Sequence, residues 1–463
     1  MIRPDMILSL FAAVSALGLT SPALAVQGRL FPNDSSVQAI LNEQVTAKKT
    51  AGIVIGLLDA DGSRRVLTAG KADNKGLVLD GNSVFEIGSI TKTFTASLLA
   101  DMLARGEVRL SDRVQQYLPA SVKIPARNGR EITLLDLVTV SSGLPGMPSN
   151  FKPADPGNPY ADYTVQQMYE FLSGYTLPRD IGSKYEYSNL GMGLLGHTLA
   201  LKAGTSYYDL LNERILKPLK MGDTEIILSP RLEQRLALGH DKNGKVVPNW
   251  DLPTLAGAGA IRSTVNDMFE YLAAHLDSTS RPLGQVLATT HTARTETGNP
   301  GLTVGMAWHI LKSPGGSIVW HNGGTGGYRT FMGFDESKRI GVIVLTNSSI
   351  GADDVGFHLI DPAVPLSKPP VARVAKSIDP ALLPPYVGTY QLAPEINIVV
   401  TLEDGVLWAA ATGQPKVRLI AESETSFFIT EDDIGISFVK EGGVVTQLIL
   451  RQGGGGSPAK KIR

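Results

Sequence analysis

The pattern of apolar and polar positions changes twice along this chain, and the changes predict its architecture. Residues 51–59 and 64–69 are apolar or alternating runs joined by Ala60-Asp-Gly-Ser63, which predicts two strands and a tight turn. From Ser89 to about residue 277, apolar residues recur mainly at helical spacing. Strand patterns then return over four segments: 302–311, 317–321, 329–335 and 341–347.

This order of elements predicts an α+β fold of the α/β sandwich type. Strands at both ends of one domain would form a single antiparallel sheet, and the helical middle would be an insertion packed against it. A cleft is expected where the sheet meets the insertion. Polar motifs at the ends of these elements would gather in that cleft.

The last part of the chain has a different pattern. Prolines are frequent from Asp361 to Pro370 and recur at Pro384-Pro385, which indicates a semi-rigid connector. Short strand patterns then follow at about ten-residue spacing, which predicts a small all-β barrel. They cover residues 386–390, 396–402, 406–411, 417–420, 427–430, 434–440 and 444–451.

The N-terminus has the features of an export signal. Arg3 precedes an apolar stretch from Met6 to Leu19, Ser21-Pro22 interrupts it, and Ala23-Leu-Ala25 matches a small-x-small cleavage site. The alternative, a membrane anchor, needs about 18 to 20 apolar residues, and this run is shorter. We therefore expect cleavage after Ala25 and an exported protein, periplasmic or secreted.

Length and composition narrow the function classes. At 463 residues the chain should hold two or three domains, and the patterns place them at 26–360, 361–378 (linker) and 379–463 after a signal peptide at 1–25. The net charge of −1 does not favour nucleic acid or an anionic membrane surface. With no cysteine, disulfides and thiolate sites are excluded. The acidic run Glu431-Asp-Asp433 lacks further ligands and is interpreted as a solvated turn, so no metal or cofactor is expected.

The first candidate motif is Ser89-Ile-Thr-Lys92. An apolar stripe at helical spacing follows it, so Ser89 should lie in the first turn of a buried helix with Lys92 on the same face. A lysine amine can take the serine proton when its pKa is lowered, and the N–H groups at a helix start favour the resulting oxyanion. A second Ser-x-x-Lys, Ser457-Pro-Ala-Lys460, follows four glycines in what we expect to be a loose tail.

Two further motifs come later. Tyr187-Ser-Asn189 lies in a loop entering an apolar helix, where the phenol could relay a proton and the amide could hold a substrate carbonyl; a capping loop with a packed tyrosine is the alternative. His321-Asn-Gly323 follows a strand pattern, and its glycines permit close approach of a ligand backbone or form a mobile hairpin tip. The other histidines, 197, 240, 275, 291, 309 and 358, are interpreted as ordinary core or surface residues.

In this order and spacing the motifs resemble those of serine penicillin-binding proteins and class C β-lactamases, and of related DD-carboxypeptidases, D-aminopeptidases and esterases. The resemblance covers about residues 35–355, and the C-terminal part resembles the lipocalin-like domain of some β-lactamase-related hydrolases. The roles that it implies are an acylated nucleophile (Ser89), its proton acceptor (Lys92), an acid/base relay (Tyr187), a substrate amide binder (Asn189), substrate contacts (His321, Gly323), and oxyanion N–H groups (Ser89, Gly324).

The third motif departs from the Lys-Thr-Gly of class C β-lactamases, because histidine replaces lysine. The resemblance therefore favours a D-Ala-D-Ala carboxypeptidase or D-amino-acid peptidase that reacts with penicillin. Alternatives are a class C-like β-lactamase, a carboxylesterase, or a penicillin-binding sensor that is acylated without turnover. With an ordinary pKa of ~6.5, His321 would bind substrate carboxylates as a cation or donor, and binding should weaken above about pH 7.

Overall fold

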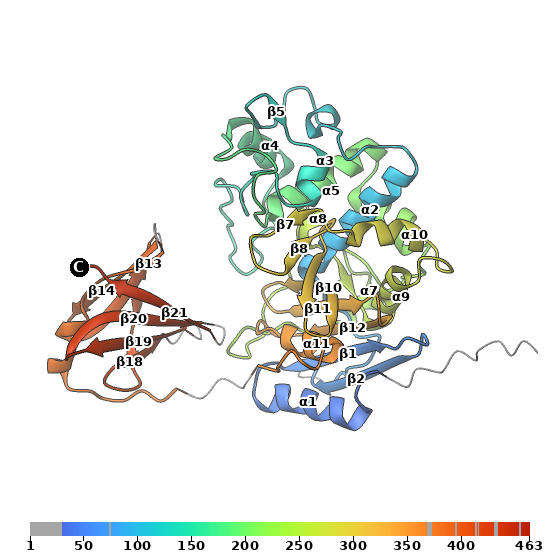
Figure 1. Ribbon diagram of the computed structural model, residues 1–463. Helices are drawn as coiled ribbons and strands as arrows, with labels where there is room; N and C mark the ends of the chain where they lie inside the picture. Colours follow the sequence, from blue (N-terminus) through green and yellow to red (C-terminus); the bar gives the residue numbers. More distant parts are fainter. Residues whose placement is uncertain are drawn as a thin grey trace, which may run out of the picture.

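The computed structural model describes residues 30–463 except 74–75, 368–372, 394–395, 413, 415, 430–433 and 453–454. The expected signal peptide and the acidic run at 431–433 lie outside the described residues. None of the helices in the described ranges has the length and apolarity needed to cross a membrane. Figure 1 shows a large part in which helices cover a sheet, and beside it a smaller β-barrel.

The large part is built on an eight-stranded antiparallel sheet in the order β2-β1-β12-β11-β10-β9-β8-β7. The two ends of the domain meet where β1 pairs with β12, as the sequence predicted, with Ile53 opposite Thr346. The expected strand at 302–311 is two strands, because the backbone turns at Ala307 with φ of 61°. The strands are β1 Gly52–Leu58, β2 Arg64–Gly70, β7 Thr295–Glu296, β8 Leu302–Val304, β9 His309–Ser313, β10 Gly316–Gly324, β11 Arg329–Asp335 and β12 Ile340–Thr346.

Helices cover both faces of this sheet, so its central strands are buried throughout. Ile53 and Ile55 point into a core with α1 and α11, whereas Val54 on the alternate face joins the core that contains α2 and α9. The helices are α1 Asp34–Thr46, α2 Thr91–Ala104, α3 Leu134–Val138, α4 Val165–Gly174, α5 Asn189–Ala203, α6 Tyr207–Leu211, α7 Pro230–Glu233, α8 Ala256–Gly259, α9 Val265–Leu276, α10 Gly284–Ala288 and α11 Asp353–Ile360.

Two of the insertion's helices present the first two motifs. Helix α2 follows the short 3-10 helix η1 (Gly88–Ile90) and is buried almost all round, which holds its first turn rigidly. Helix α5 begins at Asn189, and the Ser188 side chain caps it by accepting a hydrogen bond from the N–H of Gly191 at 2.8 Å. Asn189 is therefore fixed at a helix start.

The smaller part is a nearly closed antiparallel barrel of nine strands, which confirms the expected fold class. Its two edge strands, β16 and β17, are separated only by Leu419. The expectation of a loose tail was wrong: Ser457 and Lys460 lie in β21, which pairs with β20 and β13. The strands are β13 Gly388–Ala393, β14 Ile396–Glu403, β15 Val406–Ala411, β16 Val417–Arg418, β17 Ile420–Ala421, β18 Ser426–Ile429, β19 Ile434–Glu441, β20 Val444–Gln452 and β21 Gly455–Lys461.

Candidate active site

Ser89 lies in a short turn, and a buried ion pair stabilises the strand that leads into this turn. The preceding strand β3 (Phe85–Glu86) pairs with β6 (Arg262–Ser263), and the Arg262 guanidinium lies 3.3 Å from the Glu86 carboxylate. The same carboxylate accepts a hydrogen bond from the backbone N–H of Trp250 at 2.8 Å. Both charges are buried, so this network fixes the backbone that leads into Ser89.

The Lys92 amine lies at the centre of the site. Its Nζ is 2.9 Å from Ser89 Oγ, 2.7 Å from Asn189 Oδ1 and 2.8 Å from the backbone oxygen of Ala258 in α8. The side chain is only 1% exposed. The structure thus brings together the serine and lysine of the first motif and the asparagine of the second. Ala258 contributes a backbone atom, which no sequence motif could indicate.

Burial lowers the pKa of Lys92 well below its usual value, which favours the neutral amine. A neutral amine has two N–H donors and one lone pair. The two carbonyl-type oxygens, of Asn189 and Ala258, can only accept, so they take the two N–H groups. The lone pair is then left for the Ser89 hydroxyl, which donates to it. The three contacts of Lys92 therefore suit a base that is ready to take the Ser89 proton.

Tyr187 covers this pair from the other side. The centre of its ring is 4.7 Å from Lys92 Nζ. Burial raises the pKa of Tyr187, and its hydrogen bond with Ser89 only partly opposes that rise, so the phenol stays protonated at neutral pH. A protonated phenol beside the serine oxygen can donate a proton to a leaving group but cannot act as a ready-made anionic base.

The third motif reaches the same place, but His321 differs from the sequence-based expectation. Its ring centre is 6.3 Å from that of Tyr187, and its side chain is 1% exposed. Burial, together with the neighbouring His309, lowers the pKa of His321 well below the ordinary value. The expected titration of a cationic His321 near pH 7 was therefore wrong. Its Nδ1 donates to the backbone oxygen of Asn322 at 2.6 Å, so the neutral ring keeps Nε2 as an acceptor.

The sequence predicted that His309 is an ordinary core or surface residue. The structure instead places it beside His321 in the candidate active site. Its ring is centred 5.1 Å from the ring of His321 and stacks on Trp320 at 4.8 Å. Its Nε2 lies 3.0 Å from the hydroxyl of Tyr185, two residues before the tyrosine of the second motif. Burial lowers the pKa of His309 to about 4, so this imidazole is also neutral at physiological pH. No motif spacing signals His309, because it comes from the neighbouring strand β9.

The glycines of the third motif allow direct backbone contact with the nucleophile turn. A Cβ on Gly323 would lie 2.0 Å from the backbone oxygen of Ile87, and a Cβ on Gly88 would lie 2.7 Å from the backbone nitrogen of Gly324. Strand β10 extends through Gly324, so Gly323 and Gly324 lie within the strand and not in the hairpin tip. The Gly324 N–H thus lies next to the backbone of the Ser89 turn, where a pair of N–H groups could hold an oxyanion.

Tyr160 is another neighbour that the sequence did not reveal. Its hydroxyl accepts a hydrogen bond from Asn189 Nδ2 at 3.2 Å, and its ring packs against Trp250 at 5.4 Å between centres. Asn189 is therefore held at both ends of its amide, by Lys92 and by Tyr160. This fixes which way the amide points, with its oxygen toward the amine.

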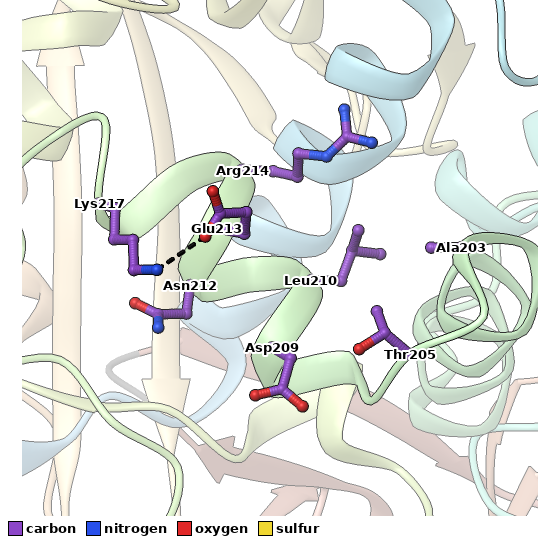
Figure 2. Close-up of a pocket in the computed structure, with 8 residues that line it drawn as sticks. All are labelled: Ala203, Thr205, Asp209, Leu210, Asn212, Glu213, Arg214 and Lys217. Carbon is purple, nitrogen blue, oxygen red and sulfur yellow. Dashed lines mark hydrogen bonds and ion pairs between the residues drawn. The ribbon is translucent and has the colours of Figure 1, made fainter.

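A separate surface hollow lies where α5 ends (Figure 2). It has a volume of about 340 Å³, and a Glu213–Lys217 ion pair of 2.7 Å lies on its wall. It holds neither a serine nor a histidine among its lining residues, which are Ala203, Thr205, Asp209, Leu210, Asn212, Glu213, Arg214 and Lys217. In the part of the chain that the structure describes, no group of three or more potential metal-ligating side chains comes together.

A serine hydrogen-bonded to a buried lysine amine, with a tyrosine ring beside the amine, is the arrangement of a serine acyl-transfer hydrolase that uses lysine as its base. Residues 37–364 match the family model described as beta-lactamase, and residues 372–457 match a domain of unknown function (DUF3471). The chain belongs to the beta-lactamase family and is a serine hydrolase.

Relatives with several names share this family. A beta-lactamase of Pseudomonas fluorescens is 28% identical over 68% of this chain and 92% of its own. The D-alanyl-D-alanine-carboxypeptidase/endopeptidase AmpH of Escherichia coli is 31% identical over 58% of this chain and 72% of its own. A penicillin-binding protein of Bacillus subtilis is 26% identical over 83% of this chain and 89% of its own.

Solved structures support the fold. A beta-lactamase/D-alanine carboxypeptidase from Yersinia pestis, complexed with citrate, superposes with a TM-score of 0.61 at 22% identity and covers 72% of this chain and 98% of its own. A class C beta-lactamase variant with a tyrosine-to-phenylalanine substitution superposes with a TM-score of 0.62 at 21% identity. It covers 71% of this chain and 96% of its own. The large part of this protein therefore has the beta-lactamase/transpeptidase fold.

Proposed function

We propose that this protein is a D-Ala-D-Ala carboxypeptidase or D-amino-acid peptidase that works through an acyl-enzyme on Ser89 and also reacts with penicillin. The observation that carries the proposal is the position of the buried Lys92 amine within hydrogen-bond distance of Ser89 Oγ, Asn189 Oδ1 and the backbone oxygen of Ala258. Two of the relatives named above are carboxypeptidases or penicillin-binding proteins, in keeping with this substrate class.

Each residue has a role in the proposed reaction. Ser89 Oγ attacks the carbonyl carbon while its proton moves to Lys92, and the carbonyl electrons move onto oxygen, which the N–H groups of Ser89 and Gly324 hold. The bond to the leaving nitrogen then breaks as Tyr187 donates its hydroxyl proton to that nitrogen. Lys92 in turn gives Tyr187 the proton that it took from Ser89. Water later releases the acyl group by the reverse transfers. Asn189 both positions the Lys92 amine and presents its amide to the substrate.

His321 would contribute an acceptor to this site. A neutral imidazole with a free Nε2 accepts a hydrogen bond from a substrate N–H, which suits a peptide-like substrate better than it suits charge pairing with a carboxylate. Gly323 beside it leaves room for the substrate backbone on the strand. A class C-like β-lactamase is the second candidate, because a relative named beta-lactamase is matched over 92% of its own length.

The first test is covalent labelling. Intact-mass spectrometry after incubation with benzylpenicillin should show one adduct on the wild type and none on Ser89→Ala. Ser457→Ala is the matched control, because it removes the serine of the other Ser-x-x-Lys and should keep the adduct. An undiminished adduct on Ser89→Ala, or no adduct on the wild type, would remove the proposal.

The second test separates the activities. A D-Ala-D-Ala peptide, a D-amino-acid amide, a short-chain ester and nitrocefin should be compared side by side at equal enzyme concentration. The proposal expects turnover to be highest on one of the first two. Highest turnover on nitrocefin would favour the β-lactamase, and highest turnover on the ester would favour a carboxylesterase. Permanent acylation without turnover would identify a sensor.

Export is part of the same proposal. The arrangement Arg3, apolar run and Ala23-Leu-Ala25 would send the chain across the membrane and release it after cleavage. A cell-wall peptide substrate is found on that side. N-terminal sequencing of protein expressed with its full leader should begin at residue 26. Retention of Met1 in the fractionated protein would count against export by this route.

A further inference from the structure

Arg329 lies against the glycine that supplies the proposed oxyanion donor. Strand β10 ends at Gly324, β11 begins at Arg329, and these two residues are the last pair of the hairpin. The backbone N–H of Thr325 donates to the oxygen of Tyr328 at 3.1 Å and closes the turn between them. Arg329 Nη1 donates to both turn oxygens, at 2.7 Å to Thr325 and 2.8 Å to Tyr328.

The absence of a side chain on Gly324 makes room for this guanidinium. A Cβ there would lie 3.1 Å from Arg329 Nη1 and 3.2 Å from Cζ. The Gly324 backbone therefore lies between two neighbours: the turn of Gly88 and Ser89 on one side, and the Arg329 guanidinium on the other. Burial lowers the pKa of Arg329 and the Asp353 carboxylate opposes that fall; an arginine remains charged at neutral pH in either case.

We propose that Arg329 is a positioning residue for the oxyanion hole, which it serves by fixing the Gly324 N–H and by placing a positive charge behind it. The inference rests on the proposed function, in which that N–H holds the oxyanion. N–H donors that are already oriented before the reaction stabilise the negative charge that develops on the carbonyl oxygen, because no free energy is spent on turning them. Loss of such a donor lowers the rate of acyl transfer sharply. In this role Arg329 acts through Gly324 and not on the reacting atoms themselves.

The test uses two readouts that depend on the oxyanion hole. One is the second-order rate constant for acylation by a fluorescent penicillin. The other is inhibition of that labelling by phenylboronic acid: a bond forms between Ser89 Oγ and boron, the serine proton passes to Lys92, and the boron becomes a tetrahedral anion in the oxyanion hole. The variants are Arg329→Met and Arg329→Lys. Arg113→Met is the control, because Arg113 is exposed and pairs with Glu131 at 2.7 Å.

We expect Arg329→Met to lower the acylation rate constant and the affinity for phenylboronic acid by the same factor, about tenfold to a hundredfold. Arg329→Lys keeps the charge and should recover part of both losses, and Arg113→Met should change neither. If acylation falls while phenylboronic acid affinity is unchanged, or if neither changes, the proposal is wrong. Should Arg329→Met fail to fold, Arg329→Lys is judged by the same two readouts.

A double-mutant cycle adds a second criterion. In Gly324→Ala the new Cβ would lie 3.1 Å from Arg329 Nη1, so the guanidinium must shift by a few tenths of an ångström. Because both changes act on the same contact, adding Arg329→Met to Gly324→Ala should lower the acylation rate constant by less than about a further threefold. Independent, multiplicative losses would overturn the inference. Failure of the proposed function is distinguishable, because the wild type would then show no labelling, or labelling at a residue other than Ser89. Labelling at Ser89 that is equally fast in Arg329→Met removes only the role of Arg329.

Discussion

Replacing Asn189 with aspartate would convert the neutral Lys92 amine into an ammonium. The substitution keeps the shape of the side chain and places a carboxylate oxygen 2.7 Å from Nζ. Two opposite charges at 2.7 Å attract by about 6 kcal/mol at an effective dielectric constant of ~20. This equals roughly four powers of ten in the fraction of neutral amine. Because burying the new carboxylate offsets part of the attraction, we expect acylation near pH 7 to fall at least about a hundredfold.

The assay is the pH dependence of acylation by a fluorescent penicillin. In Asn189→Asp the rate should recover as pH rises, because the pKa of Lys92 is raised and the amine becomes neutral only in alkaline solution. Asn189→Leu is the control, since it removes the amide without adding a charge: it should lower the rate but leave the midpoint of the profile in place. An Asn189→Asp profile with the wild-type midpoint would refute the assignment of Lys92 as the base.

Four other outcomes are expected. Gly323→Ala should destabilise the fold by about 3 kcal/mol, because its Cβ would lie 2.0 Å from a backbone oxygen, whereas Gly351→Ala, with nothing within 4 Å, should not; thermal unfolding decides. Tyr187→Phe should lower peptide turnover about a hundredfold with unchanged circular dichroism. The KM for a D-Ala-D-Ala peptide should not rise between about pH 6 and pH 8, since the lowered pKa keeps His321 neutral throughout; a rise with pH would restore a cationic role. Folding lowers the pKa of Lys92 well below its ordinary value of 10.5, so as pH falls below that value the wild type should lose stability relative to Lys92→Met by up to about 1.4 kcal/mol per pH unit; parallel denaturation curves would contradict this.

The elements that the sequence predicted well are those with a strong local pattern. Apolar runs identify the helix after Ser89 without knowledge of its neighbours. They also identify β1 and β12, the two strands whose pairing joins the ends of the domain. The contact between Ser89 and Lys92 also follows from spacing alone, because residues three apart share a helix face.

The features that were missed depend on neighbours distant in sequence. The charge state of His321 is set by burial and by His309 from the next strand, which its own motif does not encode. Strand β21 has glycines and Pro458, which argue against a strand, but β13 pairs with it only at Lys460 and Lys461. Proline can lie in β21 because no described partner from β13 needs its missing N–H.

The glycines of the first and third motifs explain why the catalytic groups meet at all. Gly88 and Gly324 approach so closely that a side chain on Gly88 would meet the Gly324 backbone, and Gly323 is equally close to the oxygen of Ile87. The nucleophile turn and the strand therefore touch through their main chains, which fixes the separation of the Ser89 and Gly324 N–H groups. A side chain on Gly88 or Gly323 must therefore move the nucleophile relative to the oxyanion donors. Stability and acylation rate should consequently fall together there, whereas at Lys92 they should change in opposite directions.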